Sequence, residues 1–503
     1  MTIVDCRPFL AVGVSLLAAV LIAFSRKWPN LRESWSVIAS ILKVGIVLSM
    51  VPAVLEGNVY TYTLCQITDT VGLTLRTDPA GMIFATLASM LWVPMNFYSI
   101  GYMRCNNESE QTGYFAAFAI CLSAVMGIAM AENLLTFFFF YELLTLASYP
   151  LVLHKRNEAA LMASRKYLIY TLISGQLFLV GVVAVYCISG TMSFTPGGFL
   201  TTDMAPKWVL QAIFVLMIIA GSVKAAVMPL HGWLPAAMIA PTPVSALLHA
   251  VAVVKTGVFS VLRIIGFVFG PKLLAELGVV DVLAWTAATT IIVSSLIALR
   301  QDHLKRRLAF STVGQLSYIV LGAALISPLS IKGAYLHLVA HAVMKITLFM
   351  CAGLIIARTH KNNISELHGI GRRLPITMTC FTIASLGIAG VPFLVGFVSK
   401  WNLALGALQA GKPLFILVWV ASALLAAGYL IPVCKMAFFK PEPKEGFVEY
   451  GDISYSMLIP ICVTTLAAVV LGTIPDIYPH FYKLAVMTSD AVCAGWFQGG
   501  GCK

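Results

Sequence analysis

Lysines inside long apolar stretches constrain this chain more than any other feature. Lys224, Lys255 and Lys345 each lie within a run of apolar residues, and Lys400 closes a fourth run. A charge at the centre of a bilayer costs about 2.5–3.5 kcal/mol on insertion scales, so such residues usually face a protein interior and serve ion or proton movement. The fold must therefore enclose these side chains between helices.

Composition places the chain among membrane proteins. Of its 503 residues, 59% are hydrophobic and 11% are charged, against roughly 25% charged residues in a soluble domain. We therefore predict an all-α polytopic membrane protein. Because a helix needs about 20 apolar residues to cross ~30 Å of hydrocarbon, we expect about 14 transmembrane helices. Their ranges are 8–25, 36–55, 81–100, 114–131, 133–153, 167–188, 208–228, 244–269, 280–299, 308–326, 333–357, 376–398, 412–436 and 455–474.

The basic residues of the connections indicate how the spans are oriented. Lys and Arg gather in alternate connections, within residues 26–32, 155–166, 300–307 and 358–373. Connections rich in Lys and Arg stay on the cytoplasmic side of a membrane. We therefore predict a multi-pass protein of the cell (inner) membrane with both termini on the non-cytoplasmic side.

Several classes of function are disfavoured. The formal charge of +12 is spread over many short connections, whereas a nucleic-acid site gathers its charge on one face. The 11 cysteines form no CxxC pair, and no nucleotide-binding fingerprint or metal-ligand spacing is found. We expect no cofactor, no metal and no redox site in the chain itself. Cys493 and Cys502 could form a disulfide in the tail that we expect outside the membrane.

Two spans are expected to be broken. The segments AGSVKAAVMPLHGWLPAAMIAPTPVSA and SLGIAGVPFLVGFVSKWNL each combine glycines, a proline and a lysine. Proline frees carbonyl groups of the preceding turn, which lipid does not tolerate but a polar cavity does. Transporters often contain two inverted halves with such helices at the binding site, so internal repetition is a further hypothesis. The longer polar segments, 56–79, 189–207 and 358–375, are expected to be loops or short caps.

Glu142 is the first candidate for proton transfer. It lies in NLLTFFFFYELLTLASYPLV, among aromatic and apolar residues, so it needs a cationic partner. At ~4 Å and an effective dielectric constant near 20, a pair with Lys224 would be coupled by about 4 kcal/mol. Protonation of the lysine would then depend on the glutamate. The alternative is a static salt bridge that only joins two helices.

The segment HLVAHAVMK carries the strongest pattern. His337, His341 and Lys345 recur every four residues and therefore share one face of a helix. Such a stripe has the composition of a proton path. His249 and Lys255 are six residues apart, about 120° from a common face, and could link different neighbours.

The remaining charged residues of the spans are interpreted as structural. Lys43, Arg263 and Lys435 are expected to extend toward the membrane surface, as long cationic side chains near helix ends often do. Glu132 begins its span; an interfacial carboxylate is the favoured interpretation, and an entry group for protons is the alternative.

At these residues the chain resembles the antiporter-like family, which includes the D-type component of Mrp cation/proton antiporters and the proton-pumping membrane subunits of respiratory complex I and membrane-bound hydrogenases. The resemblance covers roughly residues 70–440 and rests on five groups of motifs. These are RTDPAG with YSIGYM, NLLTFFFFYELLTLASYPLV, GSVKAAVMPLHGWLPAAMIAPTPVSALLHA, HLVAHAVMKITLFMCAG, and LHGIGRRLP followed by GFVSKW.

The resemblance implies about 14 helices with two inverted five-helix repeats and broken seventh and twelfth helices. In that division, one transmembrane domain fills 1–503, with N-terminal helices at 1–110, a first repeat at 114–269, a second at 280–436, and the last helix with an external C-terminal tail at 437–503.

The resemblance also implies roles for individual residues. Glu142 is similar to the family's fifth-helix glutamate and Lys224 to its seventh-helix lysine. Lys255 corresponds to the eighth-helix linking residue, His341 and Lys345 to the eleventh-helix relay, and Lys400 to the terminal lysine of the twelfth helix. Lys400 favours the Mrp D-like branch over members with glutamate there. The sequence departs from the family pattern at Val391, Pro392, Phe393 and Glu132.

Together these features predict a subunit that moves protons along Glu142, Lys224, His249, Lys255, His337, His341, Lys345 and Lys400. Its expected partners are other membrane subunits of a hetero-oligomeric complex, the lipid bilayer, protons and sodium. A redox-driven complex like complex I or a hydrogenase is the alternative to a sodium/proton antiporter. A mainly structural membrane-arm subunit and an independent transporter of a small organic solute are alternatives of other classes.

Overall fold

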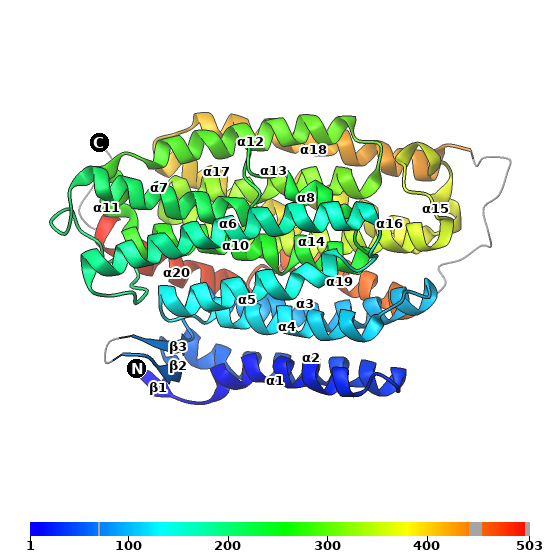
Figure 1. Ribbon diagram of the computed structural model, residues 1–503. Helices are drawn as coiled ribbons and strands as arrows, with labels where there is room; N and C mark the ends of the chain where they lie inside the picture. The colour runs from blue at the N-terminus through cyan, green and yellow to red at the C-terminus, as the bar shows by residue number, and fades with distance from the viewer. Residues whose placement is uncertain (69–70, 442–454, 498–503) are drawn as a thin grey trace.

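The protein is a bundle of long helices with a small sheet at one end. A computed structural model describes residues 1–68, 71–441 and 455–497 (Figure 1). Within these ranges, 12 helices are long and apolar enough to cross a membrane. The predicted class, an all-α polytopic membrane protein, is confirmed.

The elements have the following bounds. The strands are β1 (Thr2–Val4), β2 (Val59–Gln66) and β3 (Gly72–Arg76). The helices of the first half are α1 (Arg7–Phe24), α2 (Pro29–Leu55), α3 (Pro79–Cys105), α4 (Gln111–Ala129), α5 (Leu134–Val152), α6 (Glu158–Ser189), α7 (Lys207–Lys224), α8 (Trp233–Ala236), η1 (Ala237–Ile239), α9 (Thr242–Ala250), α10 (Val253–Arg263), the π-helix η2 (Ile264–Phe269) and α11 (Gly270–Leu277). Those of the second half are α12 (Val280–Arg300), α13 (Leu304–Ala324), α14 (Pro328–Thr359), η3 (Ile364–Glu366), α15 (Ile370–Arg373), α16 (Pro375–Ala389), α17 (Val395–Gln409), α18 (Leu414–Phe439), α19 (Tyr455–Thr473) and α20 (Phe481–Phe497).

Every predicted span contains helix in the structure. Two of these helices, α13 and α16, fall outside the 12 apolar spans. Helix α13 carries Ser311, Gln315 and Tyr318 in its buried part, so it is more polar than its neighbours. Helix α16 is short because its span is interrupted at Gly390.

The segment 56–79 forms strands where loops were expected. Strand β2 pairs in parallel with β1 and antiparallel with β3, giving the order β1-β2-β3. In the run VYTYTL of β2, β-branched residues alternate with aromatic residues, and both kinds are enriched in strands. We call the end of the bundle that carries this sheet the sheet end, and the opposite end, with α15 and the turn between α1 and α2, the basic end (Figure 1).

The two expected helix breaks are present. Helix α7 ends at Lys224 and the chain becomes helical again only at Trp233, whose indole Nε1 donates a hydrogen bond to the Val223 carbonyl at 2.7 Å. Helices α16 and α17 are separated at residues 390–394. Each break leaves backbone carbonyls without a partner in the helix. These are the free carbonyl groups that the prolines and glycines of the two segments predicted.

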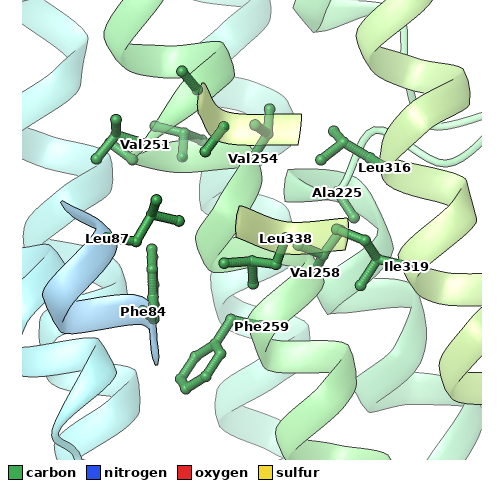
Figure 2. Packing of buried hydrophobic residues seen from close by; sticks show 14 of the residues in the cluster. Phe84, Leu87, Ala225, Val251, Val254, Val258, Phe259, Leu316, Ile319 and Leu338 are labelled. Atoms are coloured by element: carbon green, nitrogen blue, oxygen red, sulfur yellow. The ribbon is translucent and has the colours of Figure 1, made fainter. Parts of the chain in front are cut away.

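A third break, between α9 and α10 at Val251 and Ala252, was not predicted. Helix α10 then packs directly on the end of α7, because a Cβ at Gly257 would overlap the backbone of Lys224 and Ala225. Figure 2 shows apolar residues surrounding this region: Phe84 and Leu87 of α3, Val254, Val258 and Phe259 of α10, Leu316 and Ile319 of α13, and Leu338 of α14.

The part of the chain after the last predicted span contains a helix that the sequence analysis did not predict. Helix α20 buries Phe481, Leu484, Ala485, Val492 and Cys493 and packs against α3, α11 and α14. Lys483 and Asp490 lower the mean hydropathy of this segment, so a search for apolar spans does not find it. The helical spacing of its apolar residues is the signal that would have predicted α20. Cys502, the suggested disulfide partner of Cys493, lies outside the described residues.

Candidate functional site

Lys224 ends α7 and reaches toward α5. Its side chain is fully buried, and Nζ donates to the Tyr141 carbonyl at 2.7 Å and lies 3.1 Å from the centroid of the Tyr141 ring. The direct Glu142–Lys224 contact considered from the sequence is absent. Lys224 contacts the residue before Glu142, and the two charges still interact electrostatically.

Glu142 points toward α6 rather than α7. A Cβ at Gly175 of α6 would overlap its carboxylate, so the glycine makes the space that the carboxylate occupies. Glu142 is half-buried, and its Oε1 has no hydrogen-bond partner among the described residues. An unsatisfied carboxylate oxygen is a position where a proton or water can bind.

Lys255 and His341 form the closest pair of predicted path residues. Lys255 lies in the first turn of α10, just after the unpredicted break, and its Nζ is 2.9 Å from Nδ1 of His341 on α14. Both side chains are fully buried. The side chain of His249, the other residue predicted near this position, lies outside the described part of the chain. The ammonium group and the imidazole are thus placed for direct proton exchange.

His337 and Lys400 both lie beside the ring of Tyr318. His337 Nδ1 is 2.9 Å from Ser399 Oγ, and its ring stacks on Tyr318 with centroids 5.1 Å apart. Lys400 Nζ lies 5.2 Å from the same tyrosine ring and donates to the carbonyls of Ile388 and Ala389, the latter at 3.3 Å. These carbonyls belong to the last turn of α16, where the helix dipole favours a cation.

Lys345 occupies a separate position at the α13 side of α14. Its Nζ donates to Ser311 Oγ at 2.7 Å and to the Leu308 carbonyl at 3.2 Å. Tyr429 of α18 also donates to Ser311 Oγ, at 2.8 Å. Lys345 shares α14 with His337 and His341, whose ring centroids are 6.3 Å apart, so the predicted stripe lies inside the bundle.

The four lysines have one property in common. Each is bonded to carbonyl or hydroxyl oxygens or to imidazole, and none forms an ion pair with a carboxylate among the residues that the structure describes. Lys224, Lys255 and Lys345 are fully buried, and Lys400 is partly exposed. In the described ranges, no group of three or more His, Cys, Asp or Glu side chains could hold a metal ion.

Comparison with known proteins identifies the family. The family model described as "NADH:quinone oxidoreductase/Mrp antiporter, TM" matches residues 131–426, more than half of the chain. The chain belongs to this family. The matched region contains every residue of the predicted proton path.

Two relatives illustrate the breadth of the NADH:quinone oxidoreductase/Mrp antiporter family. The chain is 31% identical to the N subunit of NADH-quinone oxidoreductase from Desulforudis audaxviator over 479 residues, covering 92% of this chain and 93% of the relative. It is 25% identical to the D subunit of the Na(+)/H(+) antiporter from Bacillus subtilis over 465 residues, again covering 92% and 93%.

Solved structures share the fold of this family member. A chain of the Mrp complex from Dietzia sp. superposes with a TM-score of 0.86 at 21% identity, covering 98% of both chains. A chain of an archaeal membrane-bound sulfane sulfur reductase superposes with a TM-score of 0.85 at 22% identity, covering 97% of this chain and 98% of that one.

Two charged residues were wrongly interpreted from the sequence. Lys43 does not extend to the surface: it is fully buried, with Nζ bonded to Ser15 Oγ and to the Leu122 carbonyl at 3.2 Å. Arg263 is 1% exposed and forms a two-pronged ion pair with Asp78, the N-cap of α3. Lys435 is exposed, as expected. The Asp-Pro at the start of α3 was the one signal of a cap, and nothing in the sequence connected it to Arg263.

Proposed function

We propose that this chain translocates protons across a membrane as one subunit of a hetero-oligomeric complex. The observation that carries the proposal is the set of buried lysines in transmembrane helices, bonded to neutral groups instead of carboxylates. A buried ammonium group with only neutral partners releases its proton more easily than one held by a carboxylate.

The geometry supports a path with three positions. Lys224 near Glu142 forms the first, the Lys255–His341 pair the second, and His337 with Lys400 the third. Lys345 lies beside the second position on α14, and we include His249 on the basis of the sequence. Protons would pass between these positions by side-chain movement or through intervening water.

Two kinds of complex fit this role. The Na(+)/H(+) antiporter relative and the lysine at position 400 favour sodium/proton antiport. The higher identity with an NADH-quinone oxidoreductase component favours a redox-driven pump. Proton flux in the reconstituted complex that requires sodium and no electron donor would support the antiporter, and flux that requires an electron donor would support the pump.

The orientation follows from the charge distribution. We propose that the basic end faces the cytoplasm and the sheet end faces the opposite side of the cell (inner) membrane, with both termini on the non-cytoplasmic side. A reporter fused to the N-terminus that is active only in the cytoplasm should be inactive, whereas one inserted beside α15 should be active.

The decisive experiment compares the proton flux of two variants, one at a buried and one at an exposed lysine of the transmembrane helices. The whole complex with Lys224→Ala, reconstituted in liposomes, should assemble and lose proton flux, whereas Lys435→Ala, which changes an exposed lysine, should behave as wild type. Wild-type flux per assembled Lys224→Ala complex would refute the proposal. If the charges served only to hold helices together, the same substitution would reduce assembly and leave the flux per assembled complex unchanged.

A further inference from the structure

A cavity opens at the basic end, among residues of the predicted connections. Its volume is about 490 Å³ and charged side chains of α2, α3 and the α3–α4 connection line it, among them Arg32, Arg104, Glu108 and Glu110. Neither the predicted proton path nor the proposed function uses these residues.

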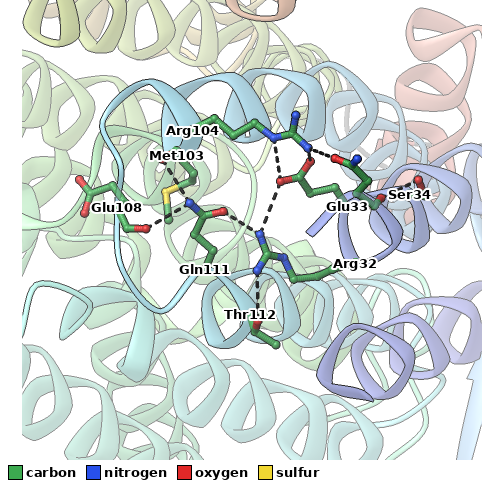
Figure 3. A network of polar contacts seen from close by, with 9 residues as sticks. Arg32, Glu33, Ser34, Met103, Arg104, Glu108, Gln111 and Thr112 are labelled. Atoms are coloured by element: carbon green, nitrogen blue, oxygen red, sulfur yellow. Dashed lines mark hydrogen bonds and ion pairs between the residues drawn. The ribbon is translucent and has the colours of Figure 1, made fainter. Parts of the chain in front are cut away.

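Glu108 is held at this cavity by a fixed network. Gln111 donates to the Glu108 carbonyl at 3.1 Å and accepts from Arg32 at 2.7 Å, while Arg32 also contacts Thr112 at 3.2 Å. Figure 3 shows that the Glu108 carboxylate points away from both arginines, which are engaged with Glu33. The backbone of Glu108 is therefore positioned while its carboxylate stays available.

A buried histidine lies directly behind this carboxylate. His154 follows α5, and its Nε2 is 3.7 Å from Glu108 Oε2. The His154 side chain is 4% exposed against 18% for Glu108, and Nε2 has no hydrogen-bond partner among the described residues. A gap of this size is closed by one bridging water or a small side-chain movement.

Lys305 is a second buried basic group that interacts electrostatically with Glu108. It lies in the first turn of α13, before the predicted span 308–326, is 6% exposed, and donates to the Ala240 carbonyl at 2.7 Å. Leu308, whose carbonyl accepts from Lys345, lies three residues further along α13. Helix α13 thus connects the charged cluster at the basic end with the stripe on α14.

The protonation of both inner groups is sensitive to this neighbourhood. Burial lowers the pKa of His154, and the charge of Glu108 opposes this effect. Burial lowers the pKa of Lys305 to about 7, with Lys155 acting in the same direction and Glu108 against it. The titratable and charged groups near the cluster include Arg26, Arg32, Glu33, Tyr102, Arg104, Glu110, Tyr114, Lys155, Arg156, His303 and Arg306.

We propose that Glu108, His154 and Lys305 form a proton-uptake site that supplies Lys345 from the basic end. The proposal rests on the proposed function, since it adds a supply route to the same path. Glu108 takes a proton from water in the cavity and passes it to Nε2 of His154, which returns Glu108 to the carboxylate. His154 then gives a proton to the neutral amine of Lys305, and Lys305 gives one to the neutral amine of Lys345, in both steps through intervening water. A collecting carboxylate matters most when protons are scarce, so the site should set the rate at high pH.

The test compares two carboxylates of the same cavity. Glu110 pairs with Arg156 at 3.9 Å and is exposed, so Glu110→Gln is the matched control for Glu108→Gln. Proton flux from the basic end into the reconstituted whole complex is measured at about pH 6 and about pH 9. Glu108→Gln should slow flux several-fold at the higher pH and little at the lower, whereas Glu110→Gln should match wild type at both.

A second variant tests the order of the groups. His154→Gln should give the same pH-dependent loss, and the double variant should be no slower than either single one, because both act in one route. Glu108→Asp, which keeps the carboxylate, should restore much of the flux and serves if Glu108→Gln does not assemble. Wild-type flux in Glu108→Gln and His154→Gln at the higher pH, with Lys224→Ala inactive, would overturn the uptake site and leave the proposed function intact. An active Lys224→Ala complex would instead reject the proposed function.

Discussion

Two buried cationic regions of this protein are built in opposite ways. Along the proton path, Lys224, Lys255 and Lys345 are bonded to carbonyl and hydroxyl oxygens and to imidazole. Near the sheet end, Arg263 is bonded to the carboxylate of Asp78 and surrounded by the rings of Phe194, Phe259 and Phe267, with its guanidinium carbon 5.1, 4.9 and 4.5 Å from their centroids. An arginine with a fixed carboxylate keeps its charge permanently.

The difference separates function from structure within one membrane bundle. A neutral shell lets a lysine change its protonation state, whereas an ion pair caged by aromatic rings fixes the positions of α3 and α10. Substitutions should therefore affect transport in the first region and stability in the second.

The largest expected effect is on transport at Lys255. Lys255→Met keeps the length of the side chain and removes the amine, so proton flux should fall about 100-fold or more, as expected for loss of a proton-transfer group. The free energy of unfolding should stay the same or rise, because no carboxylate loses its partner. Flux in liposomes and thermal unfolding of the same preparation measure both. If the Lys255→Met complex unfolded more easily and still transported protons at the wild-type rate, Lys255 would have a structural role like that of Arg263.

Arg263 should give the reverse result. Arg263→Met leaves the partly buried carboxylate of Asp78 without its partner and should lower the free energy of unfolding by about 3 kcal/mol. Flux per assembled complex should stay close to wild type. The double variant with Asp78→Asn should recover part of the stability, and a loss of flux in a fully assembled Arg263→Met complex would contradict the separation.

Gly175 tests whether the position of the Glu142 carboxylate matters for transport. Gly175→Ala places a methyl group where the Glu142 carboxylate now lies, so the carboxylate must move, at a cost of about 1–3 kcal/mol for overpacking. Flux should fall while the lysines keep their contacts. Gly113→Ala is the control, since nothing lies within 4 Å of a Cβ there; equal flux in the two variants would show that the position of Glu142 is unimportant.

Lys43 is the intermediate case and should give the smallest effect. It is buried with neutral partners like a path lysine, but it lies among α1, α2 and α4, away from the α14 stripe. Lys43→Met should leave flux unchanged and keep stability equal or raise it by about 1–4 kcal/mol. Loss of proton flux in Lys43→Met would show that the proton path includes Lys43 and the N-terminal helices.

The sequence predicted the features that depend on local composition. Hydropathy placed the spans, glycine and proline indicated the breaks after Lys224 and before Lys400, and the spacing of His337, His341 and Lys345 indicated the stripe. The break before Lys255 was missed because the run VAVV contains neither glycine nor proline, so that break is imposed by packing.

Features that depend on tertiary contacts were not predictable in the same way. Lys43 and Lys435 are both lysines within apolar helices, yet one is fully buried and the other exposed. Only the positions of neighbouring helices decide between the two outcomes. Likewise, Glu108 and His154 are separated by two helices, α4 and α5, in the sequence, and their 3.7 Å approach exists only in the folded protein.

Helix α14 runs without interruption from Pro328 to Thr359, while α9 and α16, which pack against it, each end at a break. At a rise of 1.5 Å per residue, His337, His341 and Lys345 follow one another along the helix axis at intervals of about 6 Å. An unbroken helix moves as one body, so these three groups shift only together. If successive proton transfers occur at different times, the movements that separate them must come from the broken helices, which can each move one lysine independently.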